Sequence, residues 1–473
     1  MIFNSLSFVA FWTTCLICTL LVNRLSNNII VRNLILLVAS YWFYGLFSPL
    51  FLLLLVYITI INFVAGLALD RCRNHVKKPC LSVAIILSVI PLLFYKYIGF
   101  ILSNINAMFG LNLGETWLGT ILLPVGISFF TFQTLSYTID IYRQKIKPTT
   151  DLIAFSLFVS FFPIILSGPI ERARNLLPQL SGMLKISLDE VISGVSLFTW
   201  GLFKKMVIAD RLSEYVDWAY DAADTCNGTT LAFAAILYSI QIYCDFSGYS
   251  DMAVGVARSL GINVMQNFKH PYFAHSIKEF WHRWHISLTS WFTEYVYFSL
   301  GGSRVKKRLR WFFNISLIFI LSGVWHGAAW NFVIWGCMHA VFYLIEYKLH
   351  LQPKEETHWW KYLKSIYVFV IVTVAWVFFR IEDMSKAWHI VRHSFTDGLH
   401  PIALGSSAFR TAETLALIAM FLCIDFLVYK GIILRDNAKQ FPFSIKNFCL
   451  IIFLWICISL FGASGTNFVY FQF

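Results

Sequence analysis

Long apolar runs separated by short polar segments dominate this chain of 473 residues. A helix that crosses a bilayer needs about 20 mostly apolar residues. On that rule we expect membrane spans over the stretches 5–23, 30–47, 49–68, 80–103, 152–168, 188–208, 230–257, 312–325, 329–348, 361–379, 410–430 and 446–463. We read the first run as a span and not as a cleavable signal peptide, because it lacks a basic leading segment and a small-residue cleavage site.

Two further apolar stretches, 118–141 and 286–300, are interrupted by proline, glycine or polar residues. Irregular backbone at membrane depth is tolerated only where protein surrounds it, so we expect buried or re-entrant helices there. The pattern therefore predicts an all-α polytopic membrane protein with roughly 11–14 such helices. No linker or obvious repeat divides the chain, and we expect one membrane domain over residues 1–473.

The composition supports this class. Hydrophobic residues make up 58% of the chain and charged residues 13%, whereas soluble domains carry about 25% charged residues. The 46 phenylalanines and 17 tryptophans exceed what interfacial belts require, so many rings must pack between helices or line a cavity. The ten cysteines are scattered as singles, which argues against a disulfide framework or a cysteine metal site.

Four basic clusters, at 70–78, 142–147, 203–205 and 303–310, are the strongest in short connections. The positive-inside rule predicts that all four lie in the cytoplasm. There they would also attract a phosphate-bearing donor. The formal net charge of +12 mainly reports topology in such a protein and does not imply nucleic acid.

Two aspartates lie in the apolar segment "YCDFSGYSDMAVGVARSLGI" at 243–262. Asp245 and Asp251 are six residues apart, which separates them around a helix, so we do not expect an acid/base pair on one face. We expect each to anchor a partner locally, through Arg258 or a helix terminus, and the small residues to let helices approach closely. The functional alternative is that Asp245 contributes to the polar wall of a cavity.

Histidines gather in "HPYFAHSIKEFWHRWHISLTSWFTEYVYFSLGG" at 270–302. His282 and His285 are spaced i and i+3, so we expect them on the same side of one helix. Metal binding is not favoured, because the HExxH spacing and a further Cys/His cluster are missing. We expect an amphipathic helix at the cytoplasmic interface, with His285 facing inward. His339, on a later helix, is expected to be structural.

The residue that most needs an explanation is His326, in "ILSGVWHGAAWNF" at 320–332. An ionisable group inside a span is costly and is a functional-site hypothesis by default. One interpretation is a core histidine whose ring nitrogens are bound by neighbouring carbonyls. The other is a general base, because imidazole titrates near neutrality and can take a proton from an attacking hydroxyl. In the second interpretation the small residues Gly323, Gly327, Ala328 and Ala329 keep the backbone close to a passage and leave room for a substrate beside the ring, with Trp325 and Trp330 as walls.

Six segments in matching order resemble the membrane-bound O-acyltransferase family, in particular its bacterial branch of alginate O-acetyltransferase membrane subunits. They are "LPVGISFFTFQTLSYTIDIYR" (123–143), "FFPIILSGPIER" (161–172), "FKKMVIADRL" (203–212), "YCDFSGYSDMA" (243–253), "FWHRWHISLTSWFTEYVYFSLGGSR" (280–304) and "GVWHGAAWNFVIWG" (323–336). The resemblance implies a ring of tilted helices around a central funnel or tunnel, with a catalytic core at about 120–345. The family's invariant histidine corresponds to His326 and a second histidine to His285.

The chain departs from the family pattern in one place. Where relatives usually read RDYLYIPLGG, this chain has "TEYVYFSLGG" at 293–302. Thr293 replaces an arginine and Ser299 a proline, while Glu294 retains a carboxylate. We expect activity to survive, with Trp325, Asp245 and Glu294 as candidate substrate-binding residues.

The resemblance implies an enzyme, an O-acyltransferase of the bacterial cytoplasmic (inner) membrane. The expected donor is cytosolic acetyl-CoA, with no bound cofactor and no metal, and the expected acceptor is a hydroxyl of an extracytoplasmic, alginate-like polysaccharide. His326 would assist the attack of that hydroxyl, and His285 would orient a group or help to polarise the carbonyl. A periplasmic or membrane-anchored partner protein would complete the transfer.

Alternatives with the same fold are peptidoglycan O-acetylation and D-alanylation of teichoic acid. A glycan transporter is less favoured, because transporters often have repeated halves with paired broken helices and no such duplication is visible here. A non-catalytic scaffold is the remaining class, and it would tolerate the loss of His326.

Overall fold

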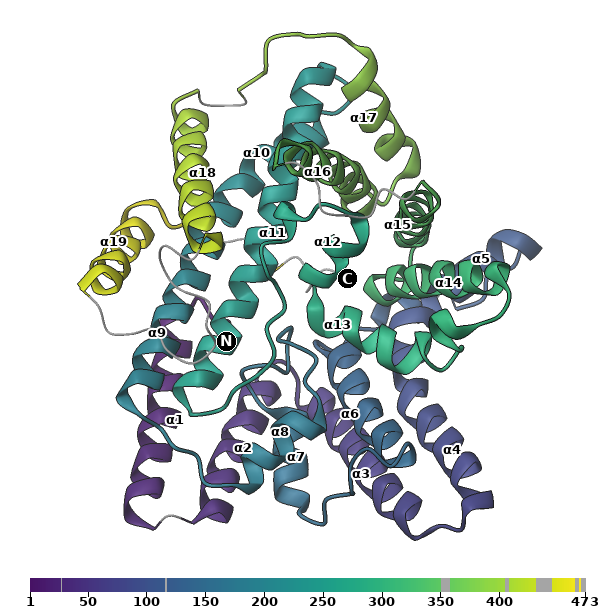
Figure 1. Cartoon of the computed structure of the whole chain (residues 1–473), viewed down its shortest axis with the longest axis vertical. Helices are drawn as coiled ribbons and strands as arrows, with labels where there is room; N and C mark the ends of the chain where they lie inside the picture. The colour runs from purple at the N-terminus through teal and green to yellow at the C-terminus, as the bar shows by residue number, and fades with distance from the viewer. Residues whose placement is uncertain are drawn as a thin grey trace. The chain divides into compact units, whose positions relative to one another are not determined.

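The computed structural model of the chain describes residues 1–26, 28–114, 117–349, 358–404, 408–430, 445–463 and 468. Throughout these ranges the regular secondary structure is helical (Figure 1). Among the described residues, eight helical segments are long and apolar enough to cross a membrane, namely Leu6–Leu25, Pro49–Arg71, Asn74–Phe109, Leu188–Asp221, Gly228–Ser259, Arg308–His326, Trp359–Arg380 and Ala412–Tyr429. The predicted class, an all-α multi-pass membrane protein, is confirmed.

The chain divides into two compact units, and two of the three boundaries fall inside α9 (Leu188–Phe203) and α11 (Gly228–Ser259), while the third follows Met265. Unit 1 consists of Met1–Phe198 and Ala253–Met265, and unit 2 of Thr199–Met252 and Gln266–Phe473. This division does not test whether the units act as one membrane domain, which stays a prediction.

Unit 1 packs its helices around aromatic side chains. Besides parts of α9 and α11, its helical elements are α1 (Leu6–Leu25), α2 (Ile29–Gly45), α3 (Pro49–Arg71), α4 (Asn74–Leu92), η1 (Leu93–Tyr97), α5 (Ile98–Phe109), η2 (Leu118–Thr120), α6 (Ile127–Tyr142), α7 (Leu152–Ser160) and α8 (Ala173–Ser181). The Phe8 ring of α1 lies 5.9 Å from the ring of Phe43 and 6.3 Å from that of Phe198. These buried rings account for part of the aromatic excess in the composition.

The predicted span over 152–168 is wrong. Helix α7 ends at Ser160 after nine residues, which is about 14 Å of helix against a hydrocarbon core of about 30 Å. Pro163, which lacks the N–H that a helix needs, lies in the turns that follow. Phe162 and Ile165 are almost completely buried, so this apolar segment is covered by protein and not by lipid.

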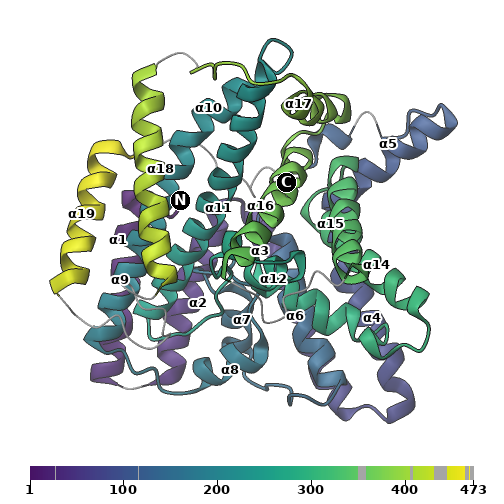
Figure 2. The ribbon, with the colours of Figure 1, turned by 45° about the horizontal axis from the view of Figure 1, so that its top comes forward.

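Unit 2 carries the histidine-rich motifs. Besides parts of α9 and α11, its elements are η3 (Lys204–Ala209), α10 (Asp210–Asp221), η4 (Pro271–Phe273), α12 (Ile277–Arg283), α13 (Ile286–Trp291), η5 (Phe292–Tyr297), η6 (Gly302–Arg304), α14 (Arg308–His326), α15 (Trp330–Lys348), α16 (His358–Arg380), α17 (Met384–Thr396), α18 (Ala408–Tyr429) and α19 (Ile445–Phe461). Helices α14 and α15 form an antiparallel hairpin and lie side by side in Figures 1 and 2.

Glycines allow α14 and α15 to lie close together in this hairpin. A Cβ at Gly323 of α14 would lie 2.2 Å from the Phe332 carbonyl oxygen, and one at Gly336 of α15 would lie 2.5 Å from the Phe319 carbonyl oxygen. Both distances are far below van der Waals contact. The hairpin therefore depends on residues without a side chain at the two crossing points.

Candidate active site

His326 is the last residue of α14 and is only 2% exposed. Its ring centroid lies 5.0 Å from that of Trp325, 5.3 Å from that of Trp335 and 5.3 Å from that of Phe379. All three pairs are close to edge-on, a preferred aromatic geometry. We call Trp325, Trp335 and Phe379 the aromatic cage of His326.

The sequence suggested a passage beside His326 that small residues leave open and two tryptophans enclose. The structure does not show these roles for Gly323, Gly327 or Trp330. A Cβ at Gly327 would lie 2.0 Å from the Phe332 ring, so the space beside Gly323 and Gly327 is filled by α15 and is not open to a substrate. Trp330 is 57% exposed and does not enclose the histidine. Trp325, which is almost completely buried, is the tryptophan of this pair that contacts it.

His285 lies in a turn, and the prediction that it shares a helix face with His282 is wrong. Helix α12 ends at Arg283, and His285 precedes α13 with a φ of 43°. This left-handed conformation costs free energy for a residue other than glycine and is concentrated at functional sites. The turn leaves His282 exposed and buries His285 completely, which agrees with the expectation that His285 faces inward.

Asn267 holds this turn in place. Its backbone carbonyl oxygen accepts a hydrogen bond from the N–H of Ile286 at 2.9 Å, and its side-chain oxygen accepts one from the Ser287 hydroxyl at 2.6 Å. Asn267 is itself 1% exposed. No local sequence pattern indicates this role of Asn267, because its partner Ser287 lies 20 residues later in the chain.

The structure brings the two histidines together. The ring centroids of His285 and His326 are 6.2 Å apart, and Trp325 contacts both rings. On the side of α11, the Phe246 ring lies 4.7 Å from the His285 ring and edge-on to it. Of the residues that the sequence proposed as a site, His326, His285 and Trp325 therefore form one buried cluster.

Asp245 is held by an ion pair next to this cluster. Its carboxylate lies 2.7 Å from the Lys205 ammonium, which is also 2.7 Å from the carboxylate of Asp210. All three side chains are at most 5% exposed. Asp245 is thus paired, but with Lys205 of η3, which the sequence did not suggest, while Arg258 donates a hydrogen bond to Ser193. Substrate binding by Asp245 stays a prediction.

Asp251 is paired in the same way with the neighbouring lysine. The Lys204 ammonium lies 2.7 Å from the Asp251 carboxylate and 2.9 Å from the Ser247 hydroxyl. Both Lys204 and Lys205 belong to the π-helical segment η3 and are buried. The prediction that 203–205 is a short connection between helices is therefore wrong, because these residues are helical and both lysines are paired inside the protein with carboxylates of α11.

A basic pocket with a volume of about 590 Å³ opens beside α12 and α14. Its wall includes aromatic rings and four side chains that are basic or can become so. The basic side chains are Lys278, His282, Lys306 and Arg308. Its lining reaches Ser322 on α14, which is one helical turn before His326 and on the same helix face.

Two aromatic rings connect this pocket with the histidine cluster. Trp281 lines the pocket and lies 5.5 Å from Trp335, and Trp335 lies 5.3 Å from His326, measured between ring centroids. The Trp335 ring is thus the layer between the pocket wall and His326.

The three positions that depart from the family pattern lie on or next to η5. Thr293 lines the basic pocket, and its hydroxyl donates a hydrogen bond to the Thr289 carbonyl at 2.8 Å. The Ser299 hydroxyl donates a hydrogen bond to the Tyr295 carbonyl at 2.6 Å, a contact that proline could not make. Glu294 is half-buried on η5, and its role in substrate binding stays a prediction.

His339 is completely buried and accepts a hydrogen bond at Nδ1 from the Trp281 indole N–H at 3.3 Å. The ring also lies between Trp281 and Trp335, at 4.9 Å from each. These contacts agree with the structural role expected for it. In the described ranges, no group of three histidine, cysteine or acidic residues is placed to hold a metal ion.

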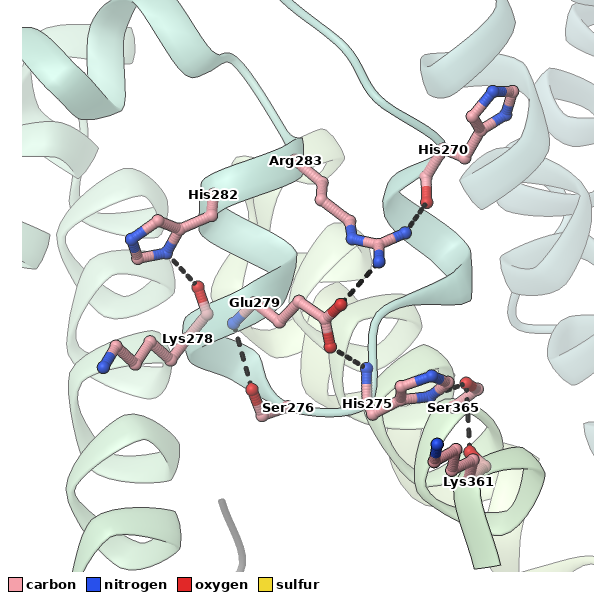
Figure 3. A network of polar contacts seen from close by, with 9 residues as sticks. All are labelled: His270, His275, Ser276, Lys278, Glu279, His282, Arg283, Lys361 and Ser365. Carbon is pink, nitrogen blue, oxygen red and sulfur yellow. Dashed lines mark hydrogen bonds and ion pairs between the residues drawn. The ribbon is translucent and has the colours of Figure 1, made fainter. Parts of the chain in front are cut away.

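A polar network holds the segment that leads into α12 (Figure 3). The Glu279 carboxylate accepts hydrogen bonds from the His275 backbone N–H at 2.8 Å and from the Arg283 guanidinium at 2.5 Å. His275 and Ser365 of α16 are joined through Nδ1 and the hydroxyl at 2.8 Å. Lys278 and His282 point to the opposite side of α12 in Figure 3, toward the basic pocket.

Comparison with known proteins agrees with the resemblance in the motifs. The family model of MBOAT, the membrane-bound O-acyltransferase family, matches residues 36–382. This range includes His285, His326 and the whole basic pocket.

Two curated relatives match over most of the chain, and a third over about half of it. The chain is 38% identical to the probable alginate O-acetylase AlgI of Azotobacter vinelandii over 370 residues, which cover 78% of this chain and 73% of that protein. It is 33% identical to the peptidoglycan O-acetyltransferase of Helicobacter pylori over 396 residues, covering 78% and 74%. The teichoic acid D-alanyltransferase of Bacillus subtilis is 32% identical over 229 residues, covering 46% and 57%.

Proposed function

Because this chain belongs to the membrane-bound O-acyltransferase family and is an O-acyltransferase with several membrane-crossing helices, we propose that it acetylates an extracytoplasmic polysaccharide. The proposed donor is cytosolic acetyl-CoA, and the proposed location is the bacterial inner membrane. Relatives that match 78% of the chain are named for acetyl transfer to alginate or peptidoglycan. A separate periplasmic or membrane-anchored protein is proposed to take part in the final transfer.

The observation that carries this proposal is the position of the two histidines. His326 and His285 lie 6.2 Å apart between ring centroids, inside aromatic side chains. A pocket with several basic side chains ends one helical turn from His326. A donor with a phosphate-bearing head and a small reactive group at its far end fits this arrangement. Its head would lie in the basic pocket and its reactive group near His326.

In the proposed reaction, His326 takes the proton of the acceptor hydroxyl while the oxygen attacks the thioester carbonyl carbon. The new C–O bond forms, the C–S bond breaks, and CoA leaves as a thiolate that takes up a proton. His285 would orient the acceptor or donate a hydrogen bond to the carbonyl oxygen as charge develops there. The surrounding rings would exclude water, which protects the thioester from hydrolysis.

The basic pocket is the proposed donor site. Lys278, Lys306 and Arg308 are available to bind phosphate oxygens, and guanidinium and ammonium groups both suit that purpose. The acetyl group would then pass the Trp335 ring to reach His326. A side-chain rotation of this ring is therefore part of the proposal.

The test is acetyl transfer from radiolabelled acetyl-CoA in membranes that contain the protein. We expect His326→Ala to reduce transfer by about 100-fold or more, the usual contribution of a general base, while expression and membrane insertion remain normal. His75→Ala is the matched control, because His75 lies in the first turn of α4 in unit 1 and is exposed. Full transfer by His326→Ala would remove His326 from the mechanism.

Peptidoglycan O-acetylation is the second candidate, because the Helicobacter pylori relative matches the same share of the chain as the alginate relative of Azotobacter vinelandii. D-alanyl transfer is less favoured, since its relative matches 46% of the chain. Acetate released by mild alkali from separated polysaccharide and peptidoglycan fractions distinguishes the acceptors. We expect the label in the polysaccharide, and label confined to peptidoglycan would overturn that choice.

A further inference from the structure

A second pocket of unit 2 lies on the other side of α12 and has a volume of about 470 Å³. We call it the interfacial pocket. Its aromatic wall includes Tyr272 and Phe273 of η4, Phe369 of α16, and Phe426 and Tyr429 of α18. Such a wall suits a ligand with a large apolar part.

Two lysines at the rim give this pocket a positive charge. Lys361 lies in the first turn of α16 and Lys430 directly follows α18, and both line the pocket. Within the part of the chain that the structure describes, neither ammonium forms an ion pair with a carboxylate. The Lys430 ammonium lies 5.4 Å from the Phe426 ring centroid and 5.6 Å from that of Tyr429, which holds it over the aromatic wall.

The rim is at the level where a membrane surface is expected. Trp359, Trp360 and Tyr362, at the start of α16, are between 49% and 59% exposed. Exposed tryptophan and tyrosine at the end of an apolar helix are typical of the boundary between hydrocarbon and water. A ligand in this pocket would thus have its charged part at the lipid headgroups and its apolar part alongside acyl chains.

The wall of the pocket is also built to keep its shape. His275 lines the pocket and is held from two sides, by Ser365 at its ring and by Glu279 at its backbone N–H (Figure 3). The ring of Phe273 stacks on that of Tyr429 at 4.5 Å between centroids. A site whose walls are fixed before binding loses less entropy when it takes a ligand.

We propose that the interfacial pocket binds one anionic phospholipid from the surrounding membrane. The phosphate lies between Lys361 and Lys430, and the upper part of the acyl chains lies against Phe369 and Phe426. Anionic lipids are attracted to basic residues at a membrane surface, and the aromatic wall favours a lipid over a free anion. This proposal does not depend on the acetyl-transfer reaction.

The experiment measures lipid bound to the purified full-length protein by native mass spectrometry. The probes are dioleoyl phosphatidylglycerol and dioleoyl phosphatidylcholine, which share their chains and differ in net charge. The test variant is Lys361→Gln/Lys430→Gln. Lys77→Gln/Lys78→Gln removes the same number of charges from the first turns of α4, away from the interfacial pocket, and is the matched control.

We expect the unmodified protein to retain one phosphatidylglycerol in preference to phosphatidylcholine. The apparent affinity should fall by about tenfold or more in the pocket variant, given two lost lysine contacts, and by less than about twofold in the control. Equal retention of both lipids, or an equal loss in both variants, would overturn the proposal. Displacement of the lipid by soluble glycerol phosphate would also overturn it, because the pocket would then be a site for a free anion.

Discussion

A single ammonium group, that of Lys205, forms ion pairs with two carboxylates beside the candidate active site. It lies 2.7 Å from Asp210 and 2.7 Å from Asp245, and the side chains are nearly inaccessible. Taking away one partner of such a group leaves an uncompensated buried charge. Phe246, the residue after Asp245, contacts the His285 ring. The ion pair is therefore next to the proposed catalytic cluster.

Replacing Lys205 with methionine should destabilise the protein strongly. We expect a loss of about 3–5 kcal/mol, because both carboxylates would be left without their counterion in a buried place. Asp245→Asn should cost about 1–3 kcal/mol, since Asp210 still neutralises the lysine. Thermal unfolding in detergent measures both changes.

The same Asp245→Asn variant decides between the two interpretations of Asp245. If the aspartate acts through Lys205, the KM for the acetyl donor in the folded fraction should change by less than about twofold, because no substrate contact is lost. A rise of KM of about tenfold at unchanged stability would instead assign Asp245 to the wall of the substrate cavity.

At the scale of helices, the pattern of apolar residues predicted most of the helices. It could not show whether lipid or protein covers a given apolar segment. It located the stretches that became α1, α2, α3, α14 and α16. It failed over 152–168, where the apolar side chains are buried in unit 1. A continuous apolar run is the same in sequence whether lipid or other side chains cover it.

The sequence predicted the two histidines of the candidate site. It did not predict the residues that hold them in position. His326 and His285 were indicated by their cost inside apolar runs and by the family motifs. The left-handed turn at His285 depends on Asn267, and the inward position of Lys205 depends on Asp245. Such contacts join segments that are distant in sequence, so no local pattern reports them.

The hairpin of α14 and α15 depends on Gly323, and this gives a prediction for the element. Gly323→Ala would place a methyl group about 2.2 Å from the Phe332 carbonyl oxygen, so the helices must separate. We expect a loss of stability of about 1–3 kcal/mol or more, together with reduced acetyl transfer because His326 ends the same helix.

Gly99→Ala is the control for that experiment. Gly99 lies in α5, and an added Cβ there would meet no atom within 4 Å. Alanine in an open helical position is neutral or slightly stabilising. Thermal unfolding and transfer assays of the two variants should therefore differ, and equal behaviour would contradict the role of Gly323 in the hairpin.

At the scale of the whole molecule, the distribution of basic residues predicts how unit 2 is oriented. Trp311, near the start of α14, contacts Tyr347, near the end of α15, at 4.3 Å between ring centroids, so both helix ends lie on one face. Glu346 of α15 accepts a hydrogen bond from the Ile277 N–H, and Ser365 of α16 bonds to His275, which adds the start of α16 to that face. The segment 303–310 on this face contains five lysines and arginines, so we expect it to be cytoplasmic.

The orientation can be tested with cysteines in a background without the native ones. Lys306→Cys lies in the basic pocket, and Ser385→Cys lies on the exposed side of α17, which follows the opposite end of α16. We expect a membrane-impermeant maleimide to label Ser385→Cys in intact cells and to label Lys306→Cys only after permeabilisation. The reverse pattern would place the basic pocket outside the cell. A cytosolic donor could not then reach it, and the acetyl-CoA proposal would fail even if His326 proved essential.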